Sequence, residues 1–507
     1  MEMSELQQLA QTIIQWGALG LAFLLGVGLL ILLVMYLVDT TQTTHTIRRN
    51  YPVVGRFRYL FEHLGEFFRQ YFFAMDREEL PFNRAERSWV YRAAKQVDAT
   101  VAFGSTRPLD RDGEVIFLNS AFPTLDEDAV APRPVTIGGD SCASPYTTSA
   151  VLNISAMSFG AISKPAVLAL SSGAREAGIW LNTGEGGLSP YHLAGGADIV
   201  FQIGTAKYGV RDAQGRLDDD KLRAVTAHEQ VKMVEIKMSQ GAKPGKGGIL
   251  PGRKVTDEIA SIRGIARGHD SISPNGHIDI RSVDDLLDMI AHVRSVSGKP
   301  TGFKMVVGQT GFFTDLFQAI HSRGLDAAPD FITIDSADGG TGAAPQPLID
   351  YVGMPLQESL PLIVDMLHEY GLRERIKVIA SGKLVNPGRV AWALSVGADF
   401  CTSARGFMFA LGCVQALQCN RNTCPTGITT HDRELQRGLV PEAKSKRVAA
   451  YARNLAYDVG VIAHSCGVAE PRGLQRHHVR VIEANGRSHS LAETRPVPAA
   501  RPEYSGD

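Results

Sequence analysis

Three cysteines lie close together in the second half of the chain, in the run Cys413-x5-Cys419-x4-Cys424-Pro425. Thiolates are soft ligands that suit iron–sulfur clusters, and a proline also follows the last cysteine of bacterial ferredoxin runs. A zinc ion bound by three cysteines and one histidine is the alternative, with His431 as the nearest histidine. Buried thiols without a metal are a third interpretation. The spacing favours metal ligation, by an iron–sulfur cluster or by zinc.

Short motifs that combine glycine with polar side chains recur along the middle of the chain. Glycine lets the backbone approach a ligand closely, and backbone N–H groups at a helix start bind phosphate groups. Lys383 and Arg405 add positive charge to the last two motifs. A single motif of this kind is more simply a turn. The six motifs are Ser158–Gly160, Gly184–Gly187, Gly241–Gly248, Asp338–Gly342, Ser381–Lys383 and Ala404–Gly406.

The elements that must position these motifs alternate between strand and helix from about residue 150 to residue 412. Eight short β-branched runs predict strands: Val151–Ala156, Ile179–Thr183, Ile199–Ile203, Val234–Met238, Gly302–Val307, Phe331–Asp335, Lys377–Ala380 and Asp399–Ser403. Helix patterns between them include Pro165–Ala177, Val283–Ser295 and Gly388–Val396. Eight strands over roughly 260 residues predict a (β/α)8 TIM barrel. A doubly wound open sheet is the alternative, because periodicity alone does not reveal closure.

The six motifs follow candidate strands at consistent positions. In a barrel, the segments after the strands all open onto one face, the catalytic one. The loops after the seventh and eighth strands, Ser381–Lys383 and Ser403–Gly406, would then form the phosphate site that is common in such barrels. Six motifs on one face therefore indicate a binding site rather than six unrelated turns.

The segment Trp16–Val38 contains 23 residues and no charge. As a helix it would be about 34 Å long, enough to cross the ~30 Å hydrocarbon core of a bilayer. A signal peptide is the alternative, but no Lys or Arg precedes the run and no A-x-A site follows it. Four arginines follow it between residues 48 and 58. The positive-inside rule then predicts a single-pass protein of the inner (cytoplasmic) membrane, with its catalytic domain in the cytoplasm.

Composition and hydropathy divide the rest of the chain. Lys+Arg number 52 and Asp+Glu 53, which gives no electrostatic case for nucleic-acid binding. We expect an anchor over residues 1–45, a juxtamembrane and N-terminal extension over 46–149, the barrel over 150–430 and a C-terminal extension over 431–507, both extensions being helical. Tyr51–Lys95 predicts an amphipathic helix, either on the membrane surface or packed on the main domain. The tail Arg495–Asp507 is rich in proline and is expected to be unstructured.

On its motifs, the chain resembles the FMN-binding synthase domain of glutamate synthases, in a membrane-anchored form that lacks the glutaminase domain. The matching stretches run in the same order over roughly half of the chain. Together, the long Ala-Lys-Pro-Gly-x-Gly-Gly loop and the cysteine run make the match specific. The stretches are Ile154–Gly160, Asn182–Gly187, Glu235–Gly245, Leu250–Gly252, Asp335–Pro345 and Leu411–Gly427.

The resemblance implies a barrel that carries FMN and a 3Fe-4S cluster, the latter held by Cys413, Cys419 and Cys424. The implied reaction condenses ammonia with 2-oxoglutarate, and hydride from reduced FMN converts 2-iminoglutarate to L-glutamate. The ammonia would be free or come from a separate protein, and ferredoxin or an NADPH-oxidising subunit would donate electrons. The implied flavin-binding residues are Met157, Ser158, Lys304, Asp338, Gly339, Gly340, Ser381, Gly382, Lys383, Ala404 and Arg405.

Charged residues on the same segments suit that substrate. A dicarboxylate needs cations at both ends, and Lys243, Arg263 and Lys304 are the candidates, with Gly247 in the same loop as Lys243. Lys304 resembles the lysine that flavin barrels place near N1 and O2 of FMN, where a positive charge stabilises the reduced flavin. Glu185 is a candidate to bind the imine nitrogen or to transfer a proton. The expected catalytic residues are therefore Glu185, Lys243 and Lys304.

Three other functions remain open on the sequence. A related amine chemistry, such as N-methylglutamate synthesis, fits a domain of this kind without glutaminase. A non-catalytic, membrane-tethered subunit that relays electrons or scaffolds a partner is the second alternative. An FMN-dependent 2-hydroxy-acid oxidase would share the barrel, but the cysteine run argues against it. We find no strand–G-x-G-x-x-G–helix fingerprint, so direct binding of NADPH is disfavoured.

Overall fold

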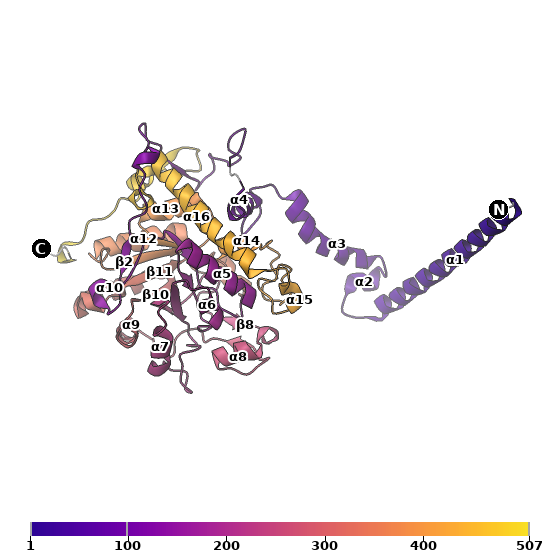
Figure 1. Cartoon of the computed structure of the whole chain (residues 1–507), viewed down its shortest axis with the longest axis horizontal. Coiled ribbons are helices and arrows are strands. Elements are labelled where there is room, and N and C mark those ends of the chain that lie inside the picture. The colour runs from indigo at the N-terminus through magenta and orange to yellow at the C-terminus, as the bar shows by residue number, and fades with distance from the viewer. Residues whose placement is uncertain (1–2, 98–99, 505–507) are drawn as a thin grey trace. The chain divides into compact units, whose positions relative to one another are not determined.

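The computed structural model describes residues 3–97 and 100–504, and the chain divides into two compact units, Met1–Ala85 and Glu86–Asp507. The first unit is helical (Figure 1), with α1 (Met3–Thr41), α2 (Thr46–Asn50) and α3 (Gly55–Phe68), and α3 continues into one π-helical turn, Arg69–Phe73. The segment Gln7–Thr41 of α1 is long and apolar enough to cross a membrane, and none of its most apolar window is buried. A signal sequence near an N-terminus passes the same test of length and composition.

The second unit contains a closed barrel of eight parallel strands, which excludes the open sheet. The barrel strands follow one another around the barrel in chain order, and β13 closes it by pairing with β4. The predicted TIM barrel is therefore confirmed, and two predicted strands, β6 and β11, have the predicted bounds. The eight are β4 (Leu152–Ile154), β5 (Leu181–Asn182), β6 (Ile199–Ile203), β7 (Val231–Lys237), β10 (Thr301–Val306), β11 (Phe331–Asp335), β12 (Lys377–Ser381) and β13 (Phe400–Ser403).

Helices follow the strands with caps that the sequence supplies. In α5 (Lys164–Ala177), the Ser163 hydroxyl accepts a hydrogen bond from the Ala166 N–H, and Gly178 ends the helix in the left-handed conformation. Asn386 caps α13 (Pro387–Val396) in the same way. The other helices between the strands include α6 (Pro190–Ala194), α7 (Asp219–Thr226), α8 (Asp257–Arg263), α9 (Val283–Ser297), α10 (Gly311–Arg323) and α12 (Leu356–Glu369), and α14 (Arg405–Leu411) follows β13.

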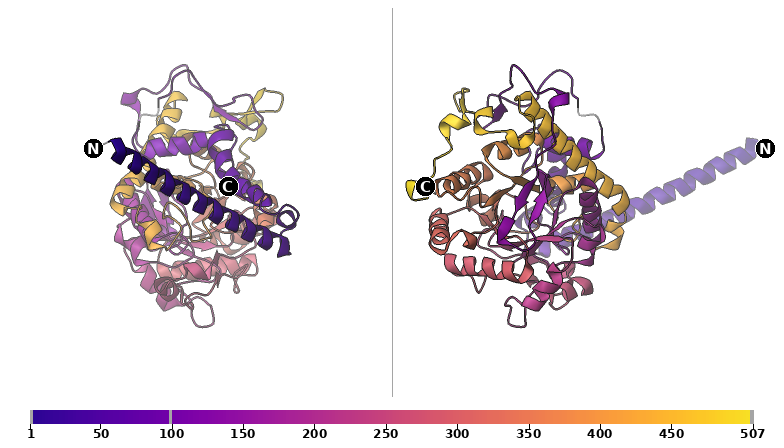
Figure 2. Two further views of the ribbon diagram at one scale, coloured as in Figure 1. Left: turned by 90° about the vertical axis from the view of Figure 1, so that its right-hand side faces the viewer. Right: turned by 60° about the vertical axis from the view of Figure 1, so that its left-hand side comes forward.

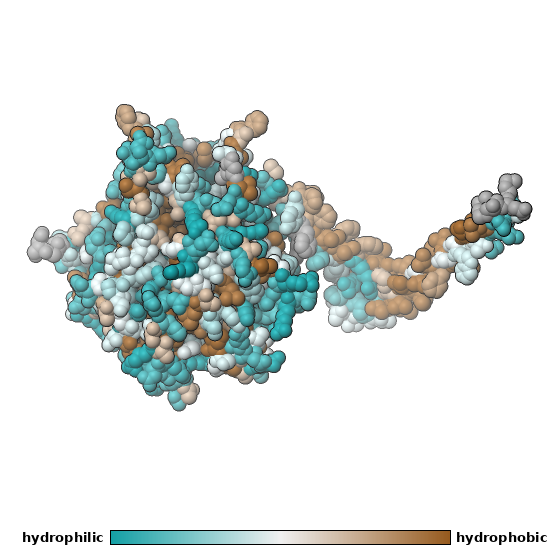
Figure 3. Space-filling view, in the orientation of Figure 1, coloured by the Kyte–Doolittle hydropathy of each residue, from teal (hydrophilic) through white to brown (hydrophobic). Residues whose placement is uncertain are grey.

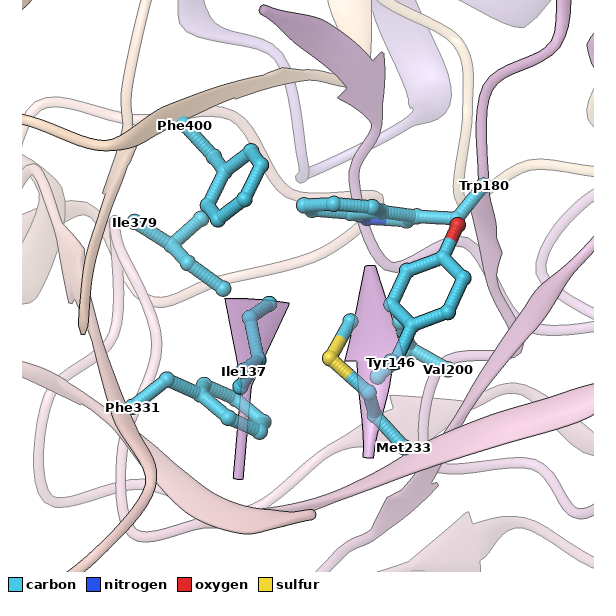
Figure 4. Packing of buried hydrophobic residues seen from close by; sticks show 8 residues of the cluster. All are labelled: Ile137, Tyr146, Trp180, Val200, Met233, Phe331, Ile379 and Phe400. Atoms are coloured by element: carbon cyan, nitrogen blue, oxygen red, sulfur yellow. The ribbon is translucent and has the colours of Figure 1, made fainter. Parts of the chain in front are cut away.

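A β-hairpin closes the N-terminal end of the barrel. Its strands are β2 (Val135–Ile137) and β3 (Tyr146–Thr148), and Ile137 and Tyr146 project among side chains from the barrel interior (Figure 4). Burial of these apolar surfaces excludes water from that end, so the opposite end is where polar chemistry can take place. The cluster is completed by Trp180, Val200, Met233, Phe331, Ile379 and Phe400.

Segments that precede the barrel strands in the sequence and segments that follow them pack together on the outside of the barrel. The long helix α16 (Pro441–Ser465) lies along α5, as Figures 1 and 2 both show. Gly173 of α5 permits this approach, because a Cβ atom there would lie 2.6 Å from the Cβ of Val448. A small antiparallel sheet pairs β1 (Val115–Phe117) with β14 (Val479–Ile482), and β14 with β15 (Ser488–Ser490).

The expectation of an unstructured C-terminal tail is wrong for its described part, residues 495–504. The ring of Tyr504 stacks on Tyr370, with centroids 5.1 Å apart, and on His321, at 4.2 Å. Arg501 forms a 2.8 Å ion pair with Glu369. These aromatic contacts hold the segment to the barrel unit despite its prolines. Residues 505–507 of the predicted tail lie outside the described residues.

Candidate active site

A polar layer lies above the apolar floor of the barrel, around Glu235 of β7. The carboxylate of Glu235 accepts hydrogen bonds from Asn182 Nδ2 (2.8 Å), Gln202 Nε2 (2.7 Å) and Thr333 Oγ1 (2.6 Å). These hydrogen bonds offset the free-energy cost of burying the Glu235 carboxylate away from water. A small cavity opens here, lined by Ser155, Trp180, Asn182, Val200, Glu235, Lys304, Thr333, Ile379 and Thr402.

Lys304 of β10 brings a positive charge to this cavity. Its Nζ atom lies 3.1 Å from Oδ2 of Asp335, which also accepts hydrogen bonds from the Gly241 N–H and, through Oδ1, from the Ser381 hydroxyl, both at 2.8 Å. Burial by itself would lower the pKa of Lys304, but Asp335 and Glu235 outweigh it and raise that pKa. Lys304 is therefore a fixed cation in the barrel interior.

Glu185 follows β5 and points toward basic residues. Its Oε2 atom lies 2.8 Å from Nζ of Lys237, and the Ser273 hydroxyl donates to it at 3.4 Å. Two glycines make room for this side chain, since a Cβ atom at Gly204 would lie 2.5 Å from its Cβ and one at Gly248 would overlap its carboxylate.

Three cations determine the protonation of Glu185. Burial would raise its pKa, but Lys237, Lys243 and Arg263 together lower the pKa of Glu185 below its ordinary value. The carboxylate is therefore ionised, and the three cations exceed it in charge. A surplus of buried positive charge is the electrostatic requirement for binding an anion.

Two of these cations, Lys243 and Arg263, are the predicted substrate-binding residues. Lys243 donates to the Ala343 carbonyl at 2.8 Å, and burial lowers its pKa to about 8. Arg263 donates to Ser271 Oγ at 3.1 Å and lies over the ring of Tyr208. Its Nε atom is buried with no hydrogen-bond partner among residues 3–97 and 100–504. That unsatisfied donor fits an anionic ligand.

The predicted flavin-binding loops are linked to one another on the same face. Lys383 Nζ lies 2.8 Å from Oδ2 of Asp338, and Arg405 Nη2 donates to the Thr341 carbonyl at 2.8 Å. The loops after β12 and β13 thus each hold the loop after β11. A phosphate group could use both cations, although it would share Lys383 with Asp338. The donor set fits a phosphorylated cofactor.

The other predicted flavin residues lie in, or next to, these loops. Met157 and Ser158 follow β4, and the Met157 N–H lies 3.4 Å from the Asn182 carbonyl. A Cβ atom at Gly184 would lie 2.6 Å from the Ser158 nitrogen, so the loops after β4 and β5 touch. Gly247 packs tightly against the Ser273 carbonyl and so shapes the loop that carries Lys243. Ser381 is the last residue of β12, and the remaining positions lie in the loops after β11, β12 and β13: Gly339, Gly340, Gly382 and Ala404.

One of the three cysteines, Cys419, lies next to Arg405, so the cysteine segment adjoins the flavin-binding loops. Arg405 Nη1 is 3.8 Å from Cys419 Sγ. Burial raises the pKa of Cys413, and the nearby thiols of Cys419 and Cys424 add to that effect. Burial also opposes ionisation of Cys424, but hydrogen bonds from Thr426 and Thr429 lower its pKa. Cys424 is buried, whereas Cys413 and Cys419 are half-buried, and as thiolates all three would be soft metal ligands.

Neither the zinc nor the iron–sulfur interpretation is supported by a preformed ligand group in the described part of the chain. Nowhere in it are three His, Cys, Asp or Glu side chains grouped as ligands of one metal ion. His431 instead lies with Nε2 at 2.8 Å from the Gly160 carbonyl. The histidine is thus already engaged by the loop after β4.

Three basic residues contact consecutive carbonyls of that loop; Arg263 was expected at the substrate, His431 was named only as a possible zinc ligand, and Lys254 was missed from the sequence. Arg263 contacts the Phe159 carbonyl (3.3 Å), His431 that of Gly160 (2.8 Å) and Lys254 that of Ala161 (2.7 Å). Lys254 is fully buried and also contacts the Cys419 carbonyl at 3.3 Å. The loop that carries Met157 and the cysteine segment are therefore joined through one lysine.

Lys237 was also missed, although a signal for it exists. It lies two residues after Glu235 on β7, and alternate residues of a strand share a face. Once Glu235 is known to face the cavity, the spacing predicts that Lys237 faces the barrel interior as well. Lys254 lies two residues after the Leu250–Gly252 motif, and nothing in its local pattern distinguishes it from a surface lysine.

Comparison with known proteins adds to this geometry. A family model described as a conserved region in glutamate synthase matches residues 115–469. A glutamate synthase large subunit-like protein of Bacillus subtilis, YerD, is 38% identical in an alignment 507 residues long. That alignment covers 92% of this chain and 96% of that protein. The chain belongs to the glutamate synthase family. The resemblance predicted from the motifs is confirmed, and membership of the family supports an oxidoreductase.

More distant relatives match only in part. The archaeal-type glutamate synthase [NADPH] of Thermotoga maritima is 35% identical over 316 residues, covering 62% of this chain and 58% of that protein. A crystal structure of mandelate oxidase with (S)-4-hydroxymandelic acid is 14% identical with a TM-score of 0.45, covering 78% of this chain and 99% of that one. The second likeness is too remote to bear on function.

Proposed function

We propose that this member of the family is an FMN-dependent oxidoreductase that reductively aminates 2-oxoglutarate with ammonia to give L-glutamate. The observation that carries the proposal is the group of buried cations, Lys237, Lys243 and Arg263, around the single carboxylate of Glu185. A dicarboxylate would neutralise the surplus positive charge. Its oxo carbon would then lie near an ionised carboxylate, which accepts hydrogen bonds from an ammonium or iminium nitrogen.

FMN fits the linked loops beside this group. Its phosphate would be held by Lys383 and Arg405, and its ring system would lie near Lys304. Met157, Ser158 and residues of the loops after β11 and β12 would complete the site. When bound, FMN supplies the hydride. Lys304, held cationic by Asp335, would favour negative charge on the reduced ring.

Cys413, Cys419 and Cys424 would hold a 3Fe-4S cluster through which electrons arrive. The contact between Arg405 and Cys419 supports a short path from this segment to the flavin loops. The donor would be ferredoxin or a separate subunit that oxidises NADPH, the coenzyme for which the archaeal-type relatives are named. The helix α1 would cross the inner membrane once, with the barrel unit in the cytoplasm, since Arg48 and Arg49 follow it.

The test is anaerobic stopped-flow absorbance of the detergent-purified, dithionite-reduced protein. We expect reoxidation of the flavin only when 2-oxoglutarate and ammonium are both present, with L-glutamate as the product. Methylammonium in place of ammonium is the matched comparison, and a faster reaction with it would replace this proposal by N-methylglutamate synthesis. Protein without flavin after expression with ample riboflavin and iron would contradict the proposal altogether.

A further inference from the structure

The exposed face of α3 and of the π-helical turn after it carries a continuous apolar stripe. Helical spacing places its members on one side, and the exposed fractions of Phe57, Phe61, Phe68 and Phe72 are 53%, 65%, 45% and 73%. Phe57 stacks on Phe61, and Phe68 packs on Phe72. Leu60 and Tyr71 extend the stripe. Contiguous exposed aromatic surface of this kind marks an interaction site.

The other side of α3 is polar. Arg58 and Glu62 form a 2.9 Å ion pair one helical turn apart, and Arg69 lies two turns further along the same side. Aromatic residues on one side and charged residues, arginines among them, on the other are typical of helices that lie in a membrane interface.

The start of α3 is fixed to the end of α1. Arg56 donates to both carboxylate oxygens of Asp39, at 2.8 Å to Oδ1 and 2.9 Å to Oδ2, and the Val53 N–H donates to Oδ2 at 3.0 Å. Asp39 is 1% exposed and Arg56 is 34% exposed, so the carboxylate is covered while the guanidinium is partly open to solvent. The stripe therefore begins where the apolar helix α1 ends, and Figure 3 shows brown side chains along both helices.

We propose that α3 and the π-helical turn lie in the headgroup region of the membrane that α1 crosses. The aromatic stripe would face the acyl chains, and Arg48, Arg49 and Arg58 would contact anionic lipid phosphates. The inference rests on α1 as the membrane anchor and is independent of the catalytic proposal. Continuity with the end of α1 and the charge of the flanking arginines make a lipid surface the occupant, rather than a second protein.

The experiment places a photoreactive p-benzoylphenylalanine in the full-length chain, reconstituted in phosphatidylcholine vesicles with and without phosphatidylglycerol. Phe61 and Phe72 are substituted on the stripe, and Glu62 and Arg69 on the opposite face as matched controls. After irradiation, mass spectrometry identifies the adducts. We expect several-fold more lipid adduct at the two stripe positions, with a further increase when phosphatidylglycerol is present.

Equal lipid adducts on both faces would overturn the inference. Cross-links from Phe61 and Phe72 to peptides of residues 86–507 would also overturn it, because the stripe would then pack on the barrel unit. Flotation of the chain with the vesicles is measured in parallel. A chain that stays at the bottom of the gradient refutes both the anchor and the interfacial helix, whereas flotation without stripe adducts refutes the helix alone.

Discussion

At the scale of single residues, the barrel interior is organised by paired charges rather than by isolated ones. Lys304 is held by Asp335, and Glu185 by Lys237, so two of the three expected catalytic groups have a partner that sets their charge. Lys243 differs, because its nearest hydrogen-bond partner is a neutral carbonyl. The first two groups should keep their charge across ordinary pH, whereas Lys243 should titrate.

Replacing Lys304 with Met should reduce glutamate formation on the order of 10²-fold, the usual cost of losing a group that stabilises developing charge. The flavin reduction potential should fall as well, because the reduced ring loses its cation. Dye-equilibrated redox titration and steady-state rates measure the two effects. Lys207 is the control, since it is also buried and paired, with Asp279 at 2.8 Å, but does not line the cavity. An unchanged potential in Lys304→Met would contradict the assigned position.

Binding of 2-oxoglutarate should weaken as the pH rises through about 8, where burial places the pKa of Lys243. Below that pH the Lys243 amine is protonated and attracts the dicarboxylate. Above it the Lys243 amine is neutral and the attraction is lost. The dissociation constant, measured by flavin fluorescence or absorbance across this range, reports the titration. Lys243→Arg should bind with little change over the same range, because arginine stays charged. A flat profile in the unmodified protein would show that Lys243 does not contact the substrate.

At the scale of elements, the strands are short and the loops after them carry most of the candidate site residues. Three donors fix the loop after β4 at Phe159, Gly160 and Ala161, and Lys254 extends that grip to the cysteine segment. A loop held at consecutive carbonyls has few conformations available, which is what an ordered cofactor site requires.

Lys254→Met should destabilise the barrel unit by about 1–3 kcal/mol, because the Ala161 carbonyl loses its buried donor. Denaturant unfolding followed by tryptophan fluorescence measures the change. Arg253→Met is the matched control, since Arg253 is exposed and its contact with the Asn420 carbonyl can be replaced by water. Equal changes in the free energy of unfolding for the two variants would show that the hydrogen bond from Lys254 to the loop after β4 adds no stability of its own.

At the scale of the whole molecule, the barrel unit depends on segments that lie far apart in the sequence. The hairpin β2–β3 fills one end of the barrel, β1 pairs with β14, and α16 covers α5. None of these contacts follows from local pattern, because each joins segments separated by many residues.

Gly173→Val tests the contact between α5 and α16. A Cβ atom at this position already lies 2.6 Å from Val448, so the variant should lose about 1–3 kcal/mol of stability through overpacking. Ser172→Val on the exposed side of the same helix controls for the lower helix propensity of valine. Thermal unfolding of the two variants gives the comparison, and a Gly173→Val protein as stable as the control would mean that the helices can separate at no cost.

The sequence by itself determined the order and approximate bounds of the barrel strands, because alternation and turn residues are local signals. It also placed the six motifs on one face and indicated the family through Cys413–Cys424 and the glycine-rich loops. The tertiary structure decided closure of the barrel, since the pairing of β10 with β7 and of β13 with β4 depends on strands brought together by folding. It also decided which charges pair. Glu185 pairs with Lys237, 52 residues further along the chain, because β5 and β7 both pair with β6, which brings the end of β7 close to the loop after β5.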